Sequence, residues 1–94
     1  VYAAAKAGVN AMTKAFAKEL APHRATANIL CPGPVETPML AANPPAIIEM
    51  FRAQLPLRYG KPDDLAAGAL FLASDEARWV SGAILDMNGG INMP

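Results

Sequence analysis

Residues 61–90, KPDDLAAGALFLASDEARWVSGAILDMNGG, decide the fold because they contain a helix followed by an apolar strand. Pro62 suits the first turn of a helix, and Asp63 and Asp64 place negative charge at the positive end of its dipole. After a turn at Ser81-Gly82, residues 83–87 predict a strand that ends in a tight turn at Asn88-Gly89-Gly90. The helix is predicted near residues 63–74, with an apolar stripe through Leu65, Ala69 and Leu72, widened by Leu70 and Ala73.

A second strand is predicted upstream, at residues 26–31 (TANILC), where Pro32-Gly33 ends a largely apolar run. An apolar strand of this kind is typical of a parallel sheet that is covered on both faces. Parallel neighbours need a connection of about a dozen residues or more, and the predicted helix supplies it. The chain is therefore predicted to be α/β, with two adjacent parallel strands joined by a right-handed crossover. Asn28 is expected to satisfy buried backbone groups.

Two further helices are predicted, near residues 2–20 and 44–54. Asn43 suits the N-cap of the second helix, and Pro44 suits its first helical position. The first helix has two distinct faces. Its apolar face contains Val9, Met12, Phe16 and Leu20, and its other face consists of small residues: Ala3, Ala7, Gly8, Ala11 and Ala15.

The composition excludes several functional classes. Eight basic residues balance eight acidic ones, so no net charge steers the chain toward nucleic acid or an anionic membrane. The apolar runs are far shorter than the ~20 residues that span a bilayer, and no signal peptide is expected. Cys31 is the single cysteine, so we expect no internal disulfide. We also expect no zinc site, because His23 is the single histidine that could join Cys31 as a ligand. We therefore expect a cytoplasmic protein, either one small domain or a piece of a larger one.

Four blocks of this sequence resemble, in order and spacing, the C-terminal part of a short-chain dehydrogenase/reductase, a Rossmann-type nicotinamide enzyme. The blocks are YAAAK (2–6), NILCPGPVETPM (28–39), GKPDDLAAGALFLASDEARWVSG (60–82) and LDMNGG (85–90). The resemblance implies that residues 1–94 form the last two strands of a doubly wound parallel sheet, with residues 34–60 as a substrate-binding lobe. Within the family, the ending NGGINM (88–93) is similar to that of bacterial 3-oxoacyl-acyl-carrier-protein reductases and acetoacetyl-CoA reductases.

Tyr2 and Lys6 are the candidate catalytic pair, because residues four apart lie on the same face of a helix. The resemblance implies that Tyr2 donates a proton to a carbonyl oxygen while NAD or NADP delivers hydride to the carbonyl carbon. A free phenol has a pKa of about 10, and a unit charge ~4 Å away at a dielectric of ~20 is worth ~4 kcal/mol, or roughly three pKa units. Lys6 could therefore bring Tyr2 close to neutral pH and also hold the cofactor ribose. The alternative is an ordinary exposed lysine beside a tyrosine at the start of a helix.

A second set of candidates follows the first predicted strand. Pro32 and Gly33 lie at its carboxyl end, where ligands bind in open α/β sheets, and the glycine lets the backbone approach a cofactor. Thr37 offers a hydroxyl to the carboxamide or the pyrophosphate. The resemblance implies that Val35 presents its backbone to the nicotinamide carboxamide. The alternative is a simple strand-to-loop turn.

Residues 38–56 contain more apolar side chains than a surface loop normally carries, so they are predicted to form a lid over a small carbonyl or alcohol substrate. Met39 and Leu40 are the candidate substrate contacts, and the alternative is that these side chains only pack the lobe on itself. Arg52 and Arg58 could meet a phosphate or carboxylate, but solvated surface charges are the preferred interpretation. The small-residue face of the first helix and the family resemblance imply a homo-oligomer, either a tetramer or a dimer.

The family's glycine-rich turn, catalytic serine and helix asparagine have no counterpart in these 94 residues. Two functions therefore stay open. The first is the catalytic C-terminal segment of an NAD(P)-dependent carbonyl reductase or alcohol dehydrogenase, and the second is a non-catalytic remnant or oligomerisation module. In either case the 94-residue chain alone is expected to be inactive, because a dinucleotide needs a phosphate-binding turn at a helix N-terminus.

Overall fold

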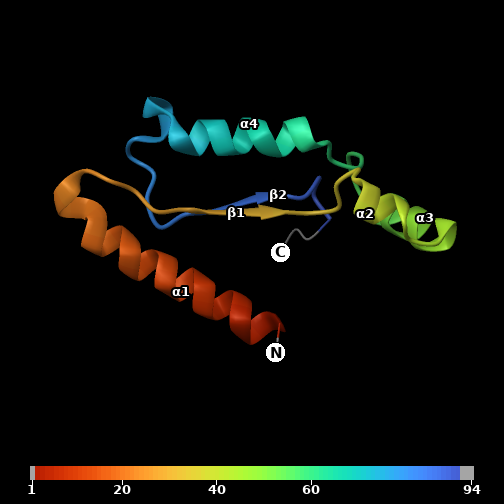
Figure 1. Ribbon diagram of the computed structural model, residues 1–94, viewed down its shortest axis with the longest axis horizontal. Coiled ribbons are helices and arrows are strands. Elements are labelled where there is room, and N and C mark those ends of the chain that lie inside the picture. Colours follow the sequence, from red (N-terminus) through yellow and green to blue (C-terminus); the bar gives the residue numbers. More distant parts are fainter. Residues whose placement is uncertain (1, 92–94) are drawn as a thin grey trace.

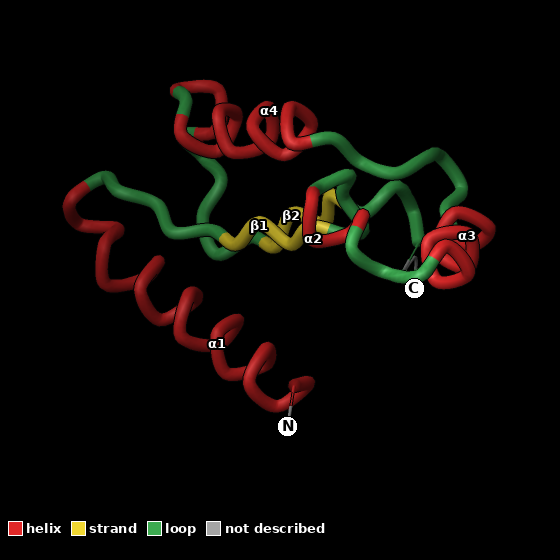
Figure 2. The backbone as a smooth tube through the Cα atoms, turned by 45° about the vertical axis from the view of Figure 1, so that its right-hand side comes forward, coloured by secondary structure: helices red, strands yellow, loops and turns green. Residues whose placement is uncertain are grey.

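The computed structural model describes residues 2–91, without the side chain of Tyr2, and its centre is a two-stranded parallel sheet (Figure 1). Strand β1 (Ile29–Pro32) pairs with β2 (Ile84–Met87), so that Ile29 lies opposite Ile84 and Pro32 opposite Met87. Helix α4 (Pro62–Ala73) covers one side of the sheet, and α1 (Tyr2–Leu20) runs along the other (Figure 2). The predicted α/β fold, with adjacent parallel strands, is confirmed.

Helix α4 approaches the sheet closely because it presents a glycine there. Gly68 is the buried residue of this helix, and a Cβ built on it would collide with the side chain of Met87 in β2. The same Cβ would lie 3.3 Å from Cδ1 of Leu30 in β1. The apolar stripe of α4 is narrower than predicted, because Leu70 is 71% exposed.

The first strand begins later than predicted, at Ile29 in place of residue 26. The side chain of Asn28 takes over the pairing just before the strand: its Nδ2 donates to the carbonyl of Val80 and its Oδ1 accepts from the N–H of Ala83, both at 3.0 Å. The expectation that Asn28 satisfies backbone groups is therefore confirmed. At this position the Asn28 side chain, in place of its backbone, bonds to residues 80 and 83, so β1 begins only after it.

The helices lie within one residue of their predicted bounds, but the N-cap predicted at Asn43 is wrong. Helix α3 spans Pro45–Gln54, and Pro44 holds its N-cap position. Asn43 instead donates to the carbonyls of Met39 and Leu40, at 3.4 and 3.1 Å. These bonds close α2 (Pro38–Ala41), a short helix that the sequence pattern did not predict.

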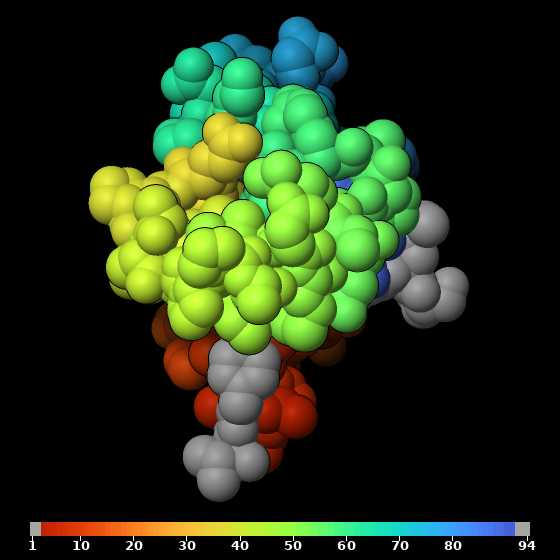
Figure 3. Space-filling model, turned by 90° about the vertical axis from the view of Figure 1, so that its right-hand side faces the viewer, coloured from red at the N-terminus to blue at the C-terminus, as the bar shows by residue number. Residues whose placement is uncertain are grey.

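The lobe of residues 34–60, with α2 and α3, lies beyond the carboxyl ends of the strands (Figure 1). Seen from that end, its yellow and green segments form the front of the molecule (Figure 3). Leu55 and Tyr59 are 8% and 4% exposed, so the apolar residues of this lobe pack partly on one another. The lobe therefore has a small core of its own next to the sheet edge.

Other apolar side chains expected in a core are exposed. As large apolar side chains, Trp79 and Phe71 are predicted from the sequence to lie in the core. Trp79 is 99% exposed and Phe71 is 42% exposed, so this prediction is wrong. The apolar face of α1 is also open, since Val9, Met12 and Phe16 are each about half exposed. Periodicity shows which face of a helix is apolar, but it does not show what covers that face.

Within residues 2–91, no helix combines the length and the apolar character that crossing a membrane requires.

Candidate functional site

Lys6 and the carboxyl end of β1 line one hollow of about 420 Å³, although they come from different elements. Lys6 lies near the start of α1, and Pro32 is the last residue of the strand. The other lining residues are Ala5, Val9, Asn10, Ile29, Leu30 and Cys31. Two predicted site positions, Lys6 and Pro32, are therefore brought together at the sheet edge where ligands of open α/β sheets bind.

The side chain of Tyr2 lies outside the described part of the chain, so its catalytic role stays a prediction. Tyr2 is the first residue of α1 and precedes Lys6 by four positions on the same helix. One turn of an α-helix brings such residues to the same face.

Asn10 is a candidate that the sequence pattern did not single out. Its Oδ1 is buried without a hydrogen-bond partner among the described residues, and the residue lines the same hollow as Lys6. Buried polar atoms are nearly always hydrogen-bonded, so this free acceptor in the hollow of Lys6 makes Asn10 a candidate for binding a donor group there. The spacing could have revealed it, because Tyr2, Lys6 and Asn10 form one row at steps of four.

Gly33 is required by the fold at this edge. Its N–H donates to the carbonyl of Met87 at 2.9 Å, which extends the pairing of the two strands by one residue. A Cβ on Gly33 would lie 2.6 Å from both Cα and Cβ of Asn88, closer than real Cβ contacts occur. This glycine therefore permits a close approach to Asn88, and its contact with a cofactor stays a prediction.

Val35 lies opposite Gly60 in an isolated parallel bridge, and the backbone groups of its two neighbours make the hydrogen bonds of that bridge. The N–H of Gly60 donates to the carbonyl of Pro34 at 3.0 Å, and the N–H of Glu36 donates to the carbonyl of Gly60 at 2.8 Å. Among the hydrogen bonds between backbone groups in residues 2–91, none uses the N–H or the C=O of Val35. A parallel bridge of this pattern directs those two groups away from Gly60, so both stay available to a ligand.

Thr37 and Leu40 are hydrogen-bonded to each other and line the same hollow, whereas Met39 does not line it. Thr37 caps α2, because its Oγ1 accepts from the N–H of Leu40 at 3.2 Å. Both residues line a second hollow, of about 440 Å³, with Ile48, Tyr59 and Arg52, and Glu36, Pro38 and Ala41 complete its walls. Met39 is 83% exposed and does not line this hollow, so of the two predicted substrate contacts only Leu40 lies in its wall.

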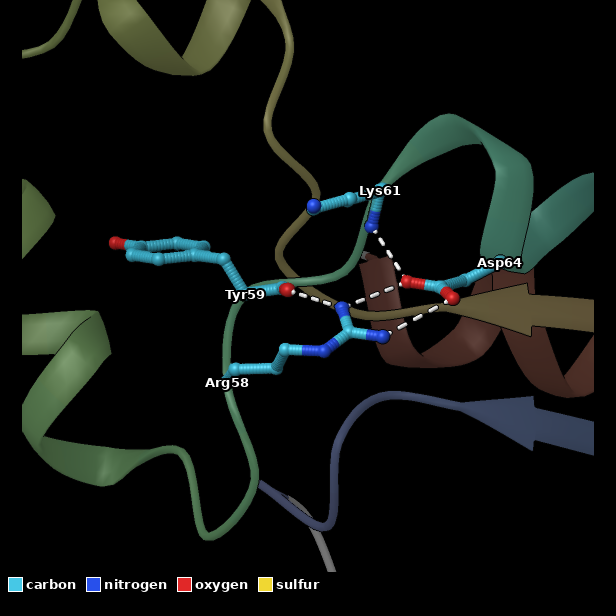
Figure 4. Close-up of polar contacts among 4 residues, drawn as sticks. All are labelled: Arg58, Tyr59, Lys61 and Asp64. Atoms are coloured by element: carbon cyan, nitrogen blue, oxygen red, sulfur yellow. Dashed lines mark hydrogen bonds and ion pairs between the residues drawn. The ribbon is translucent and has the colours of Figure 1, made fainter.

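Arg58 and Asp64 form a two-pronged ion pair between the exit of the lobe and the first turn of α4 (Figure 4). Nη1 and Nη2 of Arg58 donate to the two carboxylate oxygens at 2.8 and 3.1 Å, and the N–H of Lys61 donates to Oδ2 at 2.8 Å. The hydrogen bond from Arg58 and then that from Lys61 lower the pKa of Asp64 from 3.8 to about 2. Arg58 is therefore paired with a carboxylate of this chain, and Arg52 is paired with Glu49 at 3.2 Å.

Nearly the whole chain is similar in sequence to proteins named as reductases. A family model described as enoyl-(acyl carrier protein) reductase matches residues 1–92. A 3-oxoacyl-acyl-carrier-protein reductase of Thermotoga maritima is 46% identical over 91 residues, which are 96% of this chain and 37% of that protein. An acetoacetyl-CoA reductase of Shinella zoogloeoides is 44% identical over 91 residues, covering 95% of this chain and 38% of the relative.

A solved structure is similar as well. The crystal structure of a 3-oxoacyl-acyl-carrier-protein reductase from Brucella melitensis superposes with a TM-score of 0.92 at 36% identity, covering 99% of this chain and 35% of the other. The chain thus spans a little over a third of the length of the relatives that it matches.

Proposed function

The chain belongs to the short-chain dehydrogenase/reductase family, and on this premise we propose that it is the catalytic C-terminal segment of an oxidoreductase that interconverts a carbonyl and a secondary alcohol. The single observation that carries the proposal is the shared hollow of Lys6 and the carboxyl end of β1. Related proteins are named as reductases of 3-oxoacyl and acetoacetyl groups, and a 3α-hydroxysteroid dehydrogenase is 45% identical over 89 residues. Carbonyl–alcohol chemistry is common to these names, although their substrates differ.

The described residues fit a nicotinamide dinucleotide, either NAD or NADP. Val35 keeps a backbone donor and a backbone acceptor that no other described residue uses, which matches the carboxamide of a nicotinamide. Lys6 offers three N–H donors for ribose hydroxyls at the same sheet edge. The hydroxyl hydrogen of Thr37 remains available as a donor, because its oxygen acts as the acceptor in the α2 cap.

When bound, the nicotinamide supplies or accepts the hydride. The chain supplies the proton: Tyr2 gives it to the carbonyl oxygen in reduction and takes it back in oxidation. Lys6, one helical turn away, holds a positive charge that favours the phenolate and so brings proton exchange nearer to neutral pH. Leu40 and Ile48 exclude water from the substrate side.

The test is a pair of substitutions in a full-length protein that contains this segment. Tyr2→Phe should lower kcat by about a hundredfold to ten-thousandfold, because general acid–base catalysis contributes on the order of 10²–10⁴, while the Kd for NADH or NADPH stays within about twofold. Lys6→Met should lower kcat and also raise the Kd for the cofactor, since it removes the charge partner of Tyr2 and the ribose contact together. Fluorescence titration with cofactor and steady-state kinetics measure the two quantities. Near-normal turnover in the Tyr2→Phe protein would rule out the proposed chemistry.

A further inference from the structure

We propose that Arg58 and Asp64 are positioning residues for the cofactor loop, residues 34–37, and that they act through the backbone of Tyr59 and Gly60. The inference deepens the proposed function, because it concerns the segment that would contact the nicotinamide carboxamide. It assigns the ion pair a role in the geometry of the loop, and neither residue is expected to touch the cofactor.

The first link runs from helix α4 to the lobe exit. The guanidinium of Arg58 presents two parallel N–H donors to Asp64, a geometry that fixes the orientation of both groups. Nη1 of the same guanidinium also donates to the carbonyl oxygen of Tyr59 at 2.7 Å (Figure 4). Asp64 is itself held to the start of α4 by the N–H of Lys61. The peptide group after Tyr59 is therefore fixed relative to α4.

The second link runs from Gly60 to the cofactor loop. The two hydrogen bonds of the parallel bridge tie Gly60 to Pro34 and Glu36, the neighbours of Val35 on either side. No regular strand supports this bridge, so its register depends on the position of residues 59 and 60. A shift of Gly60 would move the backbone of Val35 with it.

A third set of contacts holds the same segment from the side of α3. The Tyr59 side chain is buried, and its hydroxyl donates to the carbonyl of Ile48. The guanidinium of Arg52 lies over the Tyr59 ring, 5.6 Å from its centre. The Tyr59 side chain is thus held by α3, and the Tyr59 carbonyl is held by Arg58, which connects it to Asp64 in α4.

The position of the pair argues for a local role. The side chains of Arg58 and Asp64 are 57% and 40% exposed, and ion pairs in such positions contribute little to overall stability. This pair nevertheless fixes local geometry, because Arg58 binds both carboxylate oxygens of Asp64 and each side chain also bonds to a backbone group. Its loss should therefore loosen the loop without unfolding the protein.

The decisive variant is Arg58→Gln in a full-length protein that contains this segment, because it leaves the bond between Asp64 and the Lys61 N–H in place. Hydrogen–deuterium exchange in the cofactor-free protein should speed up about tenfold at the amides of Glu36 and Gly60, which form the bridge. Asp64→Ala should produce the same increase, and the double variant should exceed neither single variant by more than about twofold. Asp63→Asn is the matched control, since it removes an exposed carboxylate from the same turn of α4 that does not pair with Arg58, and it should leave both amides unchanged.

Steady-state kinetics test whether the loop position affects cofactor binding. The KM for NADH or NADPH should rise about fivefold in Arg58→Gln, with kcat reduced less. With the 3-acetylpyridine analogue of the dinucleotide, which lacks the amide N–H donors of the carboxamide, the ratio of variant to wild-type KM should fall toward one. Unchanged exchange at Glu36 and Gly60 in a folded Arg58→Gln protein would overturn the inference, whatever the kinetics. Faster exchange in a protein without nicotinamide-dependent turnover would instead support the inference on the loop and contradict the proposed function.

Discussion

At the scale of single residues, two glycines next to the cofactor loop differ in the space around them: Gly33, which precedes the loop, and Gly60, which is bridged to it. Gly33 is packed against the backbone of Asn88, whereas the nearest atoms to a Cβ on Gly60 would be at ordinary distances of 3.5 and 3.6 Å. Neither glycine has a positive φ. The difference between them is therefore one of space, and it can be measured with alanine.

Gly33→Ala should lower the free energy of unfolding by about 1–3 kcal/mol, because the clash is with backbone that cannot rotate away. Gly60→Ala, in the same segment pair, should be neutral or stabilising by up to about 1 kcal/mol, since it only reduces the freedom of the unfolded chain. Chemical denaturation of full-length proteins measures both. Equal losses in the two variants would contradict the packing described for Asn88.

Residue roles could be predicted from the sequence where the chemistry is local. Asn28 is an amide next to an apolar strand, so its bonds to backbone groups could be predicted. Tyr2 and Lys6 are four residues apart, so their place on one face of α1 could be predicted from helical spacing. The pairing of Arg58 with Asp64 could not be predicted, because it depends on how the lobe returns to α4. The lack of a hydrogen-bond partner for Oδ1 of Asn10 among the described residues is also a property of packing, not of pattern.

At the scale of elements, the contact between α4 and the sheet depends on Gly68. Gly68→Ala should destabilise a full-length protein by about 1 kcal/mol, because the new methyl group meets the Met87 side chain, whose flexible end can move aside at a small cost. In a Met87→Ala background, the same substitution should cost less than about 0.5 kcal/mol, since the obstacle has been removed. Thermal unfolding of the four proteins of this cycle checks the coupling. Additive losses would show that the helix does not lie where it is described.

Helix bounds were predictable and strand bounds were less so, for a physical reason. A helix end is determined by nearby residues such as Pro62, Asp63 and Asp64, whose effects act within one turn. The start of β1 depends on bonds between Asn28 and residues 80 and 83, more than fifty positions away. Helix α2 has four residues, too few to produce a periodic pattern.

At the scale of the whole molecule, the chain is more open than a complete domain of its length. Its radius of gyration is 15.5 Å, whereas a compact domain of this size has one of about 12 Å. The exposed apolar face of α1 is part of the reason, because a packed domain would cover it. Periodicity predicted this face correctly, but only a partner or further chain determines its burial.

Ala11→Arg or Ala15→Arg should split the proposed homo-oligomer, because both residues lie exposed on the small-residue face of α1, where a charged side chain would prevent close approach of a second helix. Sedimentation velocity of full-length proteins should show a smaller species for each variant. Ala46→Arg, on the exposed surface of α3, is the control and should sediment as the wild type. Unchanged sedimentation of the α1 variants would place the interface elsewhere.

The exposure of Trp79 has a spectroscopic consequence. It is the single tryptophan of the sequence, so the intrinsic indole emission of this chain comes from one place, just after α4 on the way to β2. An indole that is 99% exposed emits as a fully hydrated chromophore and is open to a dissolved quencher such as acrylamide. Any segment or subunit that covers this corner would shift the emission to shorter wavelength and slow the quenching. The chain thus carries its own optical reporter of assembly, and no label is needed to use it.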